Sequence, residues 1–316
     1  MQRRPWHVTH SLPRAQVVYE DAHVLVVNKA AHMVVHPSAG HASGTLVNAV
    51  LHHCGLPPMR VASGTAPPSA LLPPADTGDD GMDGEGDDDD DDDTEGGGST
   101  LFLAPPHLSS GAVLRPGIVH RLDKGTSGLL VIAKDAASHS GLCSQFAARS
   151  VMRRYHALHI GCPGTPGARV EAPVGRDATN RLRMAVVWAP GARGVRTAAS
   201  RYQLLDTLAH GGAAHVAWRL ETGRTHQVRV HAKYIGVPLL GDPLYGGTPG
   251  AAAAALVRCG VAKAPATAFA DGLAQDRPCL HAAELGFTHP VTGEALHFEV
   301  PPPADFMAAL NALRLL

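Results

Sequence analysis

The sequence lacks several features that would place it in a familiar class of protein. Its 316 residues contain no apolar run close to the roughly 18 residues of a membrane helix, so we expect no membrane contact. Its five cysteines form no C-x-x-C pair, which argues against a disulfide framework or cysteine zinc site and favours an intracellular, reducing compartment. The 20 histidines show no H-E-x-x-H spacing, so no metal is expected.

The net charge of −1 hides an uneven distribution. Residues 76–95 contain 13 acidic residues and no basic one, and without this run 15 acidic residues face 27 lysines and arginines, a net charge of +12. Such a run cannot bury apolar surface, so we expect it to be disordered; one hypothesis is that it screens a basic cleft. The basic remainder favours a polyanionic partner, although solubility alone also explains a basic surface.

Hydrophobic periodicity predicts alternating strands and helices. Hairpin-like spacing after residue 161 favours a mainly antiparallel sheet with flanking helices, an α+β fold. Ser43 and Asp135 are the expected N-caps of two helices, and Gly236 is the expected end of a third. The predicted strands cover 16–20, 22–30, 129–134 and 151–161, with a closing hairpin at 279–301 turned at Thr292, and the predicted helices cover 43–54, 135–150 and 224–236.

Two biased segments interrupt the pattern. Residues from about 56 to 112 are rich in Pro, Gly, Ser, Ala and Asp and are interpreted as one long insertion. Residues from about 247 to 275 are rich in Gly and Ala and are interpreted as a loose loop. Both segments interrupt one domain, expected over residues 16–316, after an N-terminal tail at 1–15.

The segment GIVHRLDKGTSGLLVIAK, residues 117–134, places one carboxylate, Asp123, between Arg121 and Lys124. Gly125 and Gly128 allow the backbone to turn tightly behind it. Taken alone, Asp123 is better explained as a carboxylate that caps or salt-bridges a turn before the strand at 129–134. A nucleophile requires in addition that the carboxylate stay ionised, with a fixed cation beside it.

A second segment, ETGRTHQVRVHAKYIG, supplies candidate cations. Arg224 follows a glycine at a strand-to-helix junction, where a guanidinium can form a forked pair with a carboxylate. A structural arginine at a helix N-terminus is the alternative, but its charge opposes the helix dipole. Thr225, His226 and Gln227 follow as a polar cluster, and Arg229 extends a basic surface.

The third segment is RRYHALHIG. Strand alternation places Arg153 and Tyr155 on one face. A tyrosine beside arginines can stack on a base and donate its hydroxyl, although an ordinary sheet tyrosine gives the same pattern.

These segments, in this order, resemble the RluA-type family of RNA pseudouridine synthases. HRLDKGTSGLLVIAK is similar to the family's signature around its catalytic aspartate, and RRYHAL, APVGRD, LETGRTHQVRVHAKYIGVPLLGDPLYG and LHAAELGFTHPVTGE are similar to later blocks. EDAHVLVVNKAAHMVVHPSAGHASGTLVNAV resembles the opening strands. The resemblance covers most of the chain apart from the two biased segments.

The resemblance implies roles for individual residues. Asp123 becomes the nucleophile, Arg224 its paired arginine and Tyr155 the aromatic beside the target uridine, with Arg121 opening the RNA around it. With Arg121, the implied RNA-binding set contains Lys124, Arg153, His226, Gln227 and Arg229. The implied fold is the pseudouridine synthase catalytic fold, with a mixed, largely antiparallel sheet and an RNA-binding cleft.

The resemblance also implies that RNA is the partner, that no cofactor or metal takes part, and that the protein is a monomer. A uridine must leave its stack before the aspartate attacks, at the base or at C1′ of the ribose. We expect the protein in the cytoplasm or, in a eukaryote, in a chloroplast or mitochondrion.

Departures from the family pattern leave alternatives open. Ala30 and His32 replace a proline and a glycine, which predicts an altered turn, and Gly125 stands where aspartate is common. No S4-type RNA-binding domain is expected before Gln16. An inactive RNA-binding protein of the same fold is one alternative; a metal hydrolase that uses the histidines is another, for which HRLD and RTHQVRVH offer only loosely spaced ligands.

Overall fold

A computed structural model describes residues 11–12, 15–37, 43–54, 117–180, 182–189, 194–273 and 277–316. The predicted insertion at 56–112 and the acidic run lie outside these ranges. None of the helices within them is long and apolar enough to cross a lipid bilayer.

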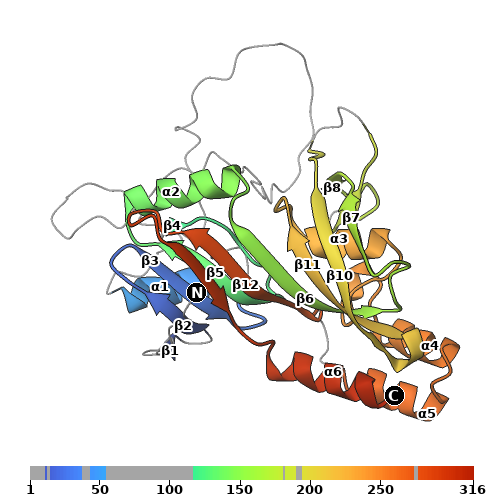
Figure 1. Ribbon diagram of the computed structural model, residues 1–316. Helices are drawn as coiled ribbons and strands as arrows, with labels where there is room; N and C mark the ends of the chain where they lie inside the picture. The colour runs from blue at the N-terminus through green and yellow to red at the C-terminus, as the bar shows by residue number, and fades with distance from the viewer. Residues whose placement is uncertain are drawn as a thin grey trace.

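One large sheet organises the described chain (Figure 1). Its strands follow the order β1-β2-β3-β5-β12-β6-β11-β10-β7, with β13 on β12 and β4 on β5, while β8 and β9 pair separately. All pairs are antiparallel except β12 with β5, which agrees with the predicted mixed, largely antiparallel sheet. The strands are β1 Ser11–Leu12, β2 Ala15–Glu20, β3 Val24–Lys29, β4 Gly117–Ile118, β5 Ser127–Ala133, β6 Met152–Ile160, β7 Gly167–Glu171, β8 Val174–Arg176, β9 Met184–Val186, β10 Ala199–Leu208, β11 Ala213–Leu220, β12 Leu280–Thr288 and β13 Ala295–Glu299.

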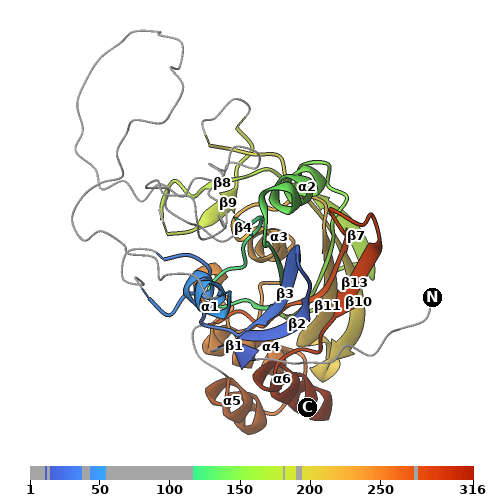
Figure 2. The same cartoon turned by 90° about the vertical axis from the view of Figure 1, so that its left-hand side faces the viewer.

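Helices cover the sheet on both faces (Figure 2). Because side chains alternate along a strand, β5 sends Leu130 to the core beneath α1 and α3 and Leu129 to the core beneath α2. A third core joins the far end of β6 to α4, α5 and α6. The helices are α1 Leu46–His53, α2 Ala136–Ala147, α3 Gln227–Tyr234, α4 Pro249–Arg258, α5 Lys263–Asp271 and α6 Ala304–Leu315, with short 3₁₀ turns η1 Ala209–Gly211 and η2 Pro243–Tyr245.

The structure confirms several predicted elements and corrects others. Asp135 caps α2 by accepting the backbone N–H of Ser138 at 2.8 Å, as predicted. The cap of α1 is Thr45 in a capping box with Asn48, two residues after the predicted Ser43. The predicted tail also extends too far, since β1 and the start of β2 lie before residue 16.

The prediction of a loose loop at 247–275 is wrong, because this stretch forms α4 and α5. Thr248 caps α4 by accepting the backbone N–H of Ala251, and Pro249 occupies the first turn, where its missing N–H has no cost. Alanine, the strongest helix former, fills the rest of α4.

Strand β12 comes late in the sequence but lies in the interior of the sheet, between β5 and β6. Gly128 on β5 permits this approach. Its φ is +118°, and a Cβ at this position would lie 2.3 Å from the carbonyl oxygen of Ala282 on β12. Through β12, the strand that follows Asp123 and the strand that carries Tyr155 belong to one sheet.

His32 adopts a backbone conformation that glycine tolerates better. Its φ is +63°, in the left-handed region, at the position where the family pattern has a glycine. Replacing His32 with glycine is therefore expected to raise the free energy of unfolding by about 0.5–1 kcal/mol. Glycine removes the strain of the left-handed conformation, and the greater entropy of glycine in the unfolded chain offsets part of that gain. Urea denaturation measures this; His32→Ala, which keeps the strain, is the control, and a less stable glycine variant would contradict the prediction.

Candidate active site

The loop that carries Asp123 is fixed by a hydrogen bond of its own and by contacts with two other parts of the chain. Within the loop, the backbone N–H of Thr126 donates to the carbonyl of Asp123 at 3.0 Å. Lys29 Nζ, fully buried at the end of β3, donates to the carbonyl of Lys124 at 3.4 Å, and Arg277 Nη1 donates to that of Gly125 at 2.9 Å. Asp123 thus stands on a turn held from both sides.

Lys29 is buried among backbone carbonyls. Its Nζ also donates to the carbonyls of Ala30 and Met33, which closes the turn after β3. Burial lowers the pKa of Lys29 to about 7, although the negative charge of Asp123 acts to raise it. Since the same amine bonds the Asp123 loop, the turn and the loop are positioned together.

Asp123 pairs with Arg229, which is itself held by Asp242. Arg229 Nη1 lies 3.3 Å from Oδ2 of Asp123, while its Nε and Nη2 donate to Asp242 at 2.7 and 3.0 Å. Asp242 is fully buried. The guanidinium carbon also lies 4.9 Å from the ring centroid of Tyr245. A forked, stacked arginine of this kind is a fixed cation.

The charge around Asp123 keeps the carboxylate ionised. Burial alone would raise the pKa of Asp123, but the charges of His226, Arg229 and Arg121 and the hydrogen bond from Arg229 outweigh it, so the pKa is lowered. Burial in turn lowers the pKa of His226. At neutral pH the persistent nearby cation in contact with Asp123 is therefore Arg229.

His226 faces Asp123 with one nitrogen and Tyr245 with the other. Its Nε2 lies 3.8 Å from Oδ2 of Asp123, and its Nδ1 lies 2.8 Å from the Tyr245 hydroxyl. The Tyr245 oxygen also accepts the backbone N–H of Met184 at 2.8 Å. We assign the single proton of the buried hydroxyl to the bond with Nδ1, which leaves the proton of the neutral imidazole on Nε2, facing Asp123.

The backbone at His226 explains why α3 begins at Gln227, three residues later than predicted. His226 is left-handed, with a φ of +56°, and precedes the first helical residue. This reversal places Arg229 in the first turns of α3, directed at Asp123 and Asp242. Left-handed non-glycine residues are uncommon and concentrate at functional sites.

Two residues predicted for the site have other contacts. Arg224, predicted to pair with Asp123, donates from Nε to the carbonyl of Thr197 at 3.2 Å, and the arginine hydrogen-bonded to Asp123 is Arg229. Gln227, predicted to bind RNA, is 2% exposed and bonds both the Arg224 backbone and β10. It holds the loop in place and presents no free amide to RNA.

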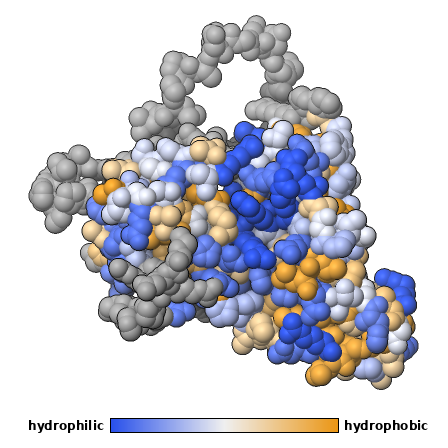
Figure 3. All heavy atoms as spheres, viewed as in Figure 1, coloured by the Kyte–Doolittle hydropathy of each residue, from blue (hydrophilic) through white to orange (hydrophobic). Residues whose placement is uncertain are grey.

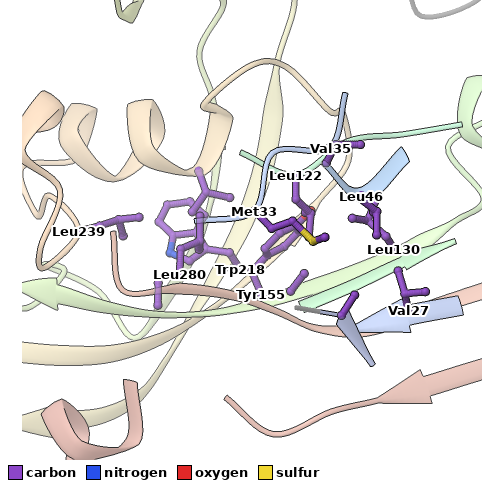
Figure 4. Packing of buried hydrophobic residues seen from close by; sticks show 14 of the residues in the cluster. Val27, Met33, Val35, Leu46, Leu122, Leu130, Tyr155, Trp218, Leu239 and Leu280 are labelled. Atoms are coloured by element: carbon purple, nitrogen blue, oxygen red, sulfur yellow. The ribbon is translucent and has the colours of Figure 1, made fainter. Parts of the chain in front are cut away.

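Tyr155 and Arg153 lie on the same face of β6, as strand alternation predicted. The Tyr155 ring packs near Leu122 and Trp218 (Figure 4). Burial raises the pKa of Tyr155, Arg153 lowers it and Asp123 raises it, so both charges are close to this side chain. Arg121 and Lys124 are exposed on either side of Asp123. Hydrophilic side chains gather on the surface between the end of α2 and the region of β8 and β10 (Figure 3).

Sequence reasoning missed Asp242 and Tyr245, which lie in the GDPLYG block. An acid six residues after a helix-ending glycine was a possible signal, because buried carboxylates require a cation. Among the described residues, no group of three or more His, Cys, Asp and Glu side chains is arranged to hold a metal ion.

Comparison with known proteins agrees with this geometry. Residues 23–234 match the sequence model of the family described as RNA pseudouridylate synthase. The chain is 51% identical over 301 residues to RNA pseudouridine synthase 2, chloroplastic, of Arabidopsis thaliana, an alignment that covers 94% of this chain and 64% of that protein. It is 38% identical over 312 residues to ribosomal large subunit pseudouridine synthase D of Zymomonas mobilis, covering 99% and 77%.

The solved structure of human RNA pseudouridylate synthase domain containing 4 superposes with a TM-score of 0.56 at 20% identity, over 94% of this chain and 92% of that chain, a likeness of fold alone. The chain spans just under two thirds, 64%, of the length of the Arabidopsis relative. The family match extends from β3 to α3 and includes Asp123, Tyr155 and Arg229. The chain therefore belongs to the RNA pseudouridylate synthase family.

Proposed function

We propose that this protein isomerises uridine in RNA to pseudouridine, with Asp123 as the nucleophile. The observation that carries the proposal is the ionised Asp123 on a rigid loop, hydrogen-bonded to an arginine that a buried second carboxylate holds in place. A carboxylate maintained in this way is prepared for covalent attack. The family membership supports the same reaction.

The reaction balances without a co-reactant. Asp123 attacks the base or C1′ of the ribose, and the bond between N1 and C1′ breaks. The uracil turns, C5 bonds to C1′, and C5 loses a proton while N1 regains one. No electrons are exchanged with a partner, and the carboxylate is released unchanged.

The surrounding residues divide the remaining tasks. Arg229 keeps Asp123 ionised and oriented, and the Nε2–H of His226 is directed toward the same oxygen. Tyr155 lies between the apolar core and the charged groups, where its ring can hold the extruded base. Bound RNA excludes water from the half-buried carboxylate, which limits hydrolysis of the intermediate.

Large-subunit ribosomal RNA in an organelle is the substrate we propose. The Zymomonas relative is named a ribosomal large subunit enzyme, and the Arabidopsis and rice relatives are named chloroplastic. An inactive RNA-binding protein is the second candidate, but the intact Asp123 and its network do not favour it.

Release of tritium tests the reaction directly. RNA transcribed with [5-³H]uridine loses its label to water only when C5 is deprotonated, so total ribosomal RNA from cells lacking the protein should release tritium on addition of the purified chain. Chemical mapping of pseudouridine in the same RNA then names the site. Tight binding without tritium release would support the inactive alternative.

Tyr245 is a positioning residue in this scheme. Tyr245→Phe removes the hydroxyl that directs the His226 proton to Nε2, so kcat is expected to fall roughly tenfold with little change in KM. Nitrogen-15 NMR of labelled histidine should show the His226 tautomer redistributing, which a merely structural role would not produce. An unchanged tautomer would contradict the assignment.

A further inference from the structure

Arg153 is a buried cation to which the described part of the chain offers no carboxylate partner. The residue is 8% exposed, and its Nε is enclosed without any hydrogen-bond partner. The guanidinium makes a cation–π contact with Phe146 at the end of α2. Its carbon lies 5.4 Å from the centroid of the Phe146 ring. Among the described residues, no acid forms an ion pair with it.

The neighbours of Arg153 offer it no negative charge. His120 stacks on the same Phe146 ring, with centroids 4.7 Å apart, and accepts the backbone N–H of Val131 at Nε2. Burial lowers the pKa of His120 to about 3, so this ring is neutral at physiological pH. A buried unpaired charge is costly, and a cation–π contact offsets only a small part of that cost.

The contrast with Arg154 shows that the missing partner is specific to this side of the strand. Arg154 is the next residue on β6 and points to the opposite face, where it donates to Glu284 at 3.0 Å. Arg229, equally buried, has Asp242 and Asp123. Of these three arginines, only Arg153 forms no ion pair with a carboxylate of the described residues.

Arg153 is also placed beside the proposed base site. It precedes Tyr155 by two residues on the same face of an extended strand, a spacing of roughly 6.6 Å. Tyr155 is within electrostatic reach of both Arg153 and Asp123. An anion at Arg153 would therefore lie about one nucleotide's length from a base held by Tyr155.

We propose that Arg153 binds a phosphodiester group of the RNA strand next to the target uridine. The inference rests on the proposed function for the identity of the base, but the anion site follows from the unpaired guanidinium. A phosphate oxygen supplies the acceptor that the described residues do not provide, and a guanidinium is suited to bind it in a forked manner. The cost of burying the charge is offset when RNA binds.

The test compares Arg153→Met with Arg154→Met, which removes the same charge from the other face of β6. The first probe is a dodecauridylate, bound by each variant and by the unaltered protein at several salt concentrations. Arg153→Met should bind about tenfold more weakly, and its plot of log K against log salt should be shallower by about 0.7, the loss of one single-strand phosphate contact. Arg153→Lys should retain the slope.

The second probe separates the phosphate from the base. Uridine and uridine 3′,5′-bisphosphate are titrated by NMR, and the unaltered protein and Arg154→Met should prefer the bisphosphate. Arg153→Met should bind uridine equally well but lose the preference. If uridine itself does not bind any variant, the proposed base site fails while the dodecauridylate result still decides the anion site.

Thermal unfolding supplies the last criterion. Because an unpaired buried charge is replaced by an apolar side chain, Arg153→Met should melt at the same temperature as the unaltered protein or higher. A lower melting temperature would show that the contact with Phe146 is structural and would overturn the proposal. An unchanged salt dependence in Arg153→Met would overturn it as well.

Discussion

Replacing Asp123 with asparagine should reduce turnover by roughly 10⁴-fold or more, the scale on which loss of a covalent nucleophile acts in other enzymes. The amide has nearly the shape of the carboxylate and can still accept from Arg229, so the loop should stay in place. RNA affinity should change little, because the backbone contacts of the loop do not involve the side chain.

Tritium release in a single turnover measures the chemical step, and filter binding of the same RNA measures affinity. The pair of results separates chemistry from recognition. Activity within tenfold of the unaltered protein would exclude Asp123 as the nucleophile.

Replacing Arg229 with methionine should have the second-largest effect, a loss of roughly 10²- to 10³-fold at pH 7, typical of removing one fixed electrostatic group. Two consequences follow from the contacts of Arg229. Asp123 loses its hydrogen-bonded cation, so its pKa should rise, and the fully buried Asp242 is left unpaired. The second effect should destabilise the fold by about 3–5 kcal/mol.

The sign of the pH effect follows from the ionised form being the active one. In the unaltered protein the pKa of Asp123 is lowered, so activity persists as pH falls until the carboxylate is protonated. Without Arg229 the pKa rises, and the acid limb of the kcat profile should move to higher pH, so that the deficit shrinks as pH increases.

The double variant Arg229→Met/Asp242→Asn keeps the pH test interpretable. It removes the unpaired carboxylate, so the fold should recover part of its stability while the acid limb stays shifted. An unshifted limb in both variants would show that Arg229 does not set the ionisation of Asp123.

Local signals predicted much of the fold. The Asp135 cap, the fully buried β5 and the alternation of β6 depend on neighbours in the sequence, and the structure confirms each of them. The helices at 249–271 were missed for a different reason. An alanine-rich composition was interpreted as flexibility, although Thr248 and Pro249 together mark the start of a helix.

The partner of Asp123 depends on geometry that local patterns do not contain. Arg224 and Arg229 are five residues apart and chemically identical, and their order in the motif does not say which one faces the carboxylate. The left-handed turn at His226 decides it, by delaying the helix and directing Arg229 inward. Asp242, which fixes that arginine, approaches from a separate loop.

The interior position of β12 has a consequence for biosynthesis. Ser127 and His281 are 154 positions apart in the chain, yet their side chains meet at 2.9 Å where β5 and β12 run parallel. Until the ribosome has made residue 288, β5 and β6 each expose an unpaired edge, and such edges recruit strands from other nascent chains. Pairings this distant also form slowly. Chaperone dependence during translation is thus the expected cost of joining the nucleophile loop and the tyrosine strand through a late segment.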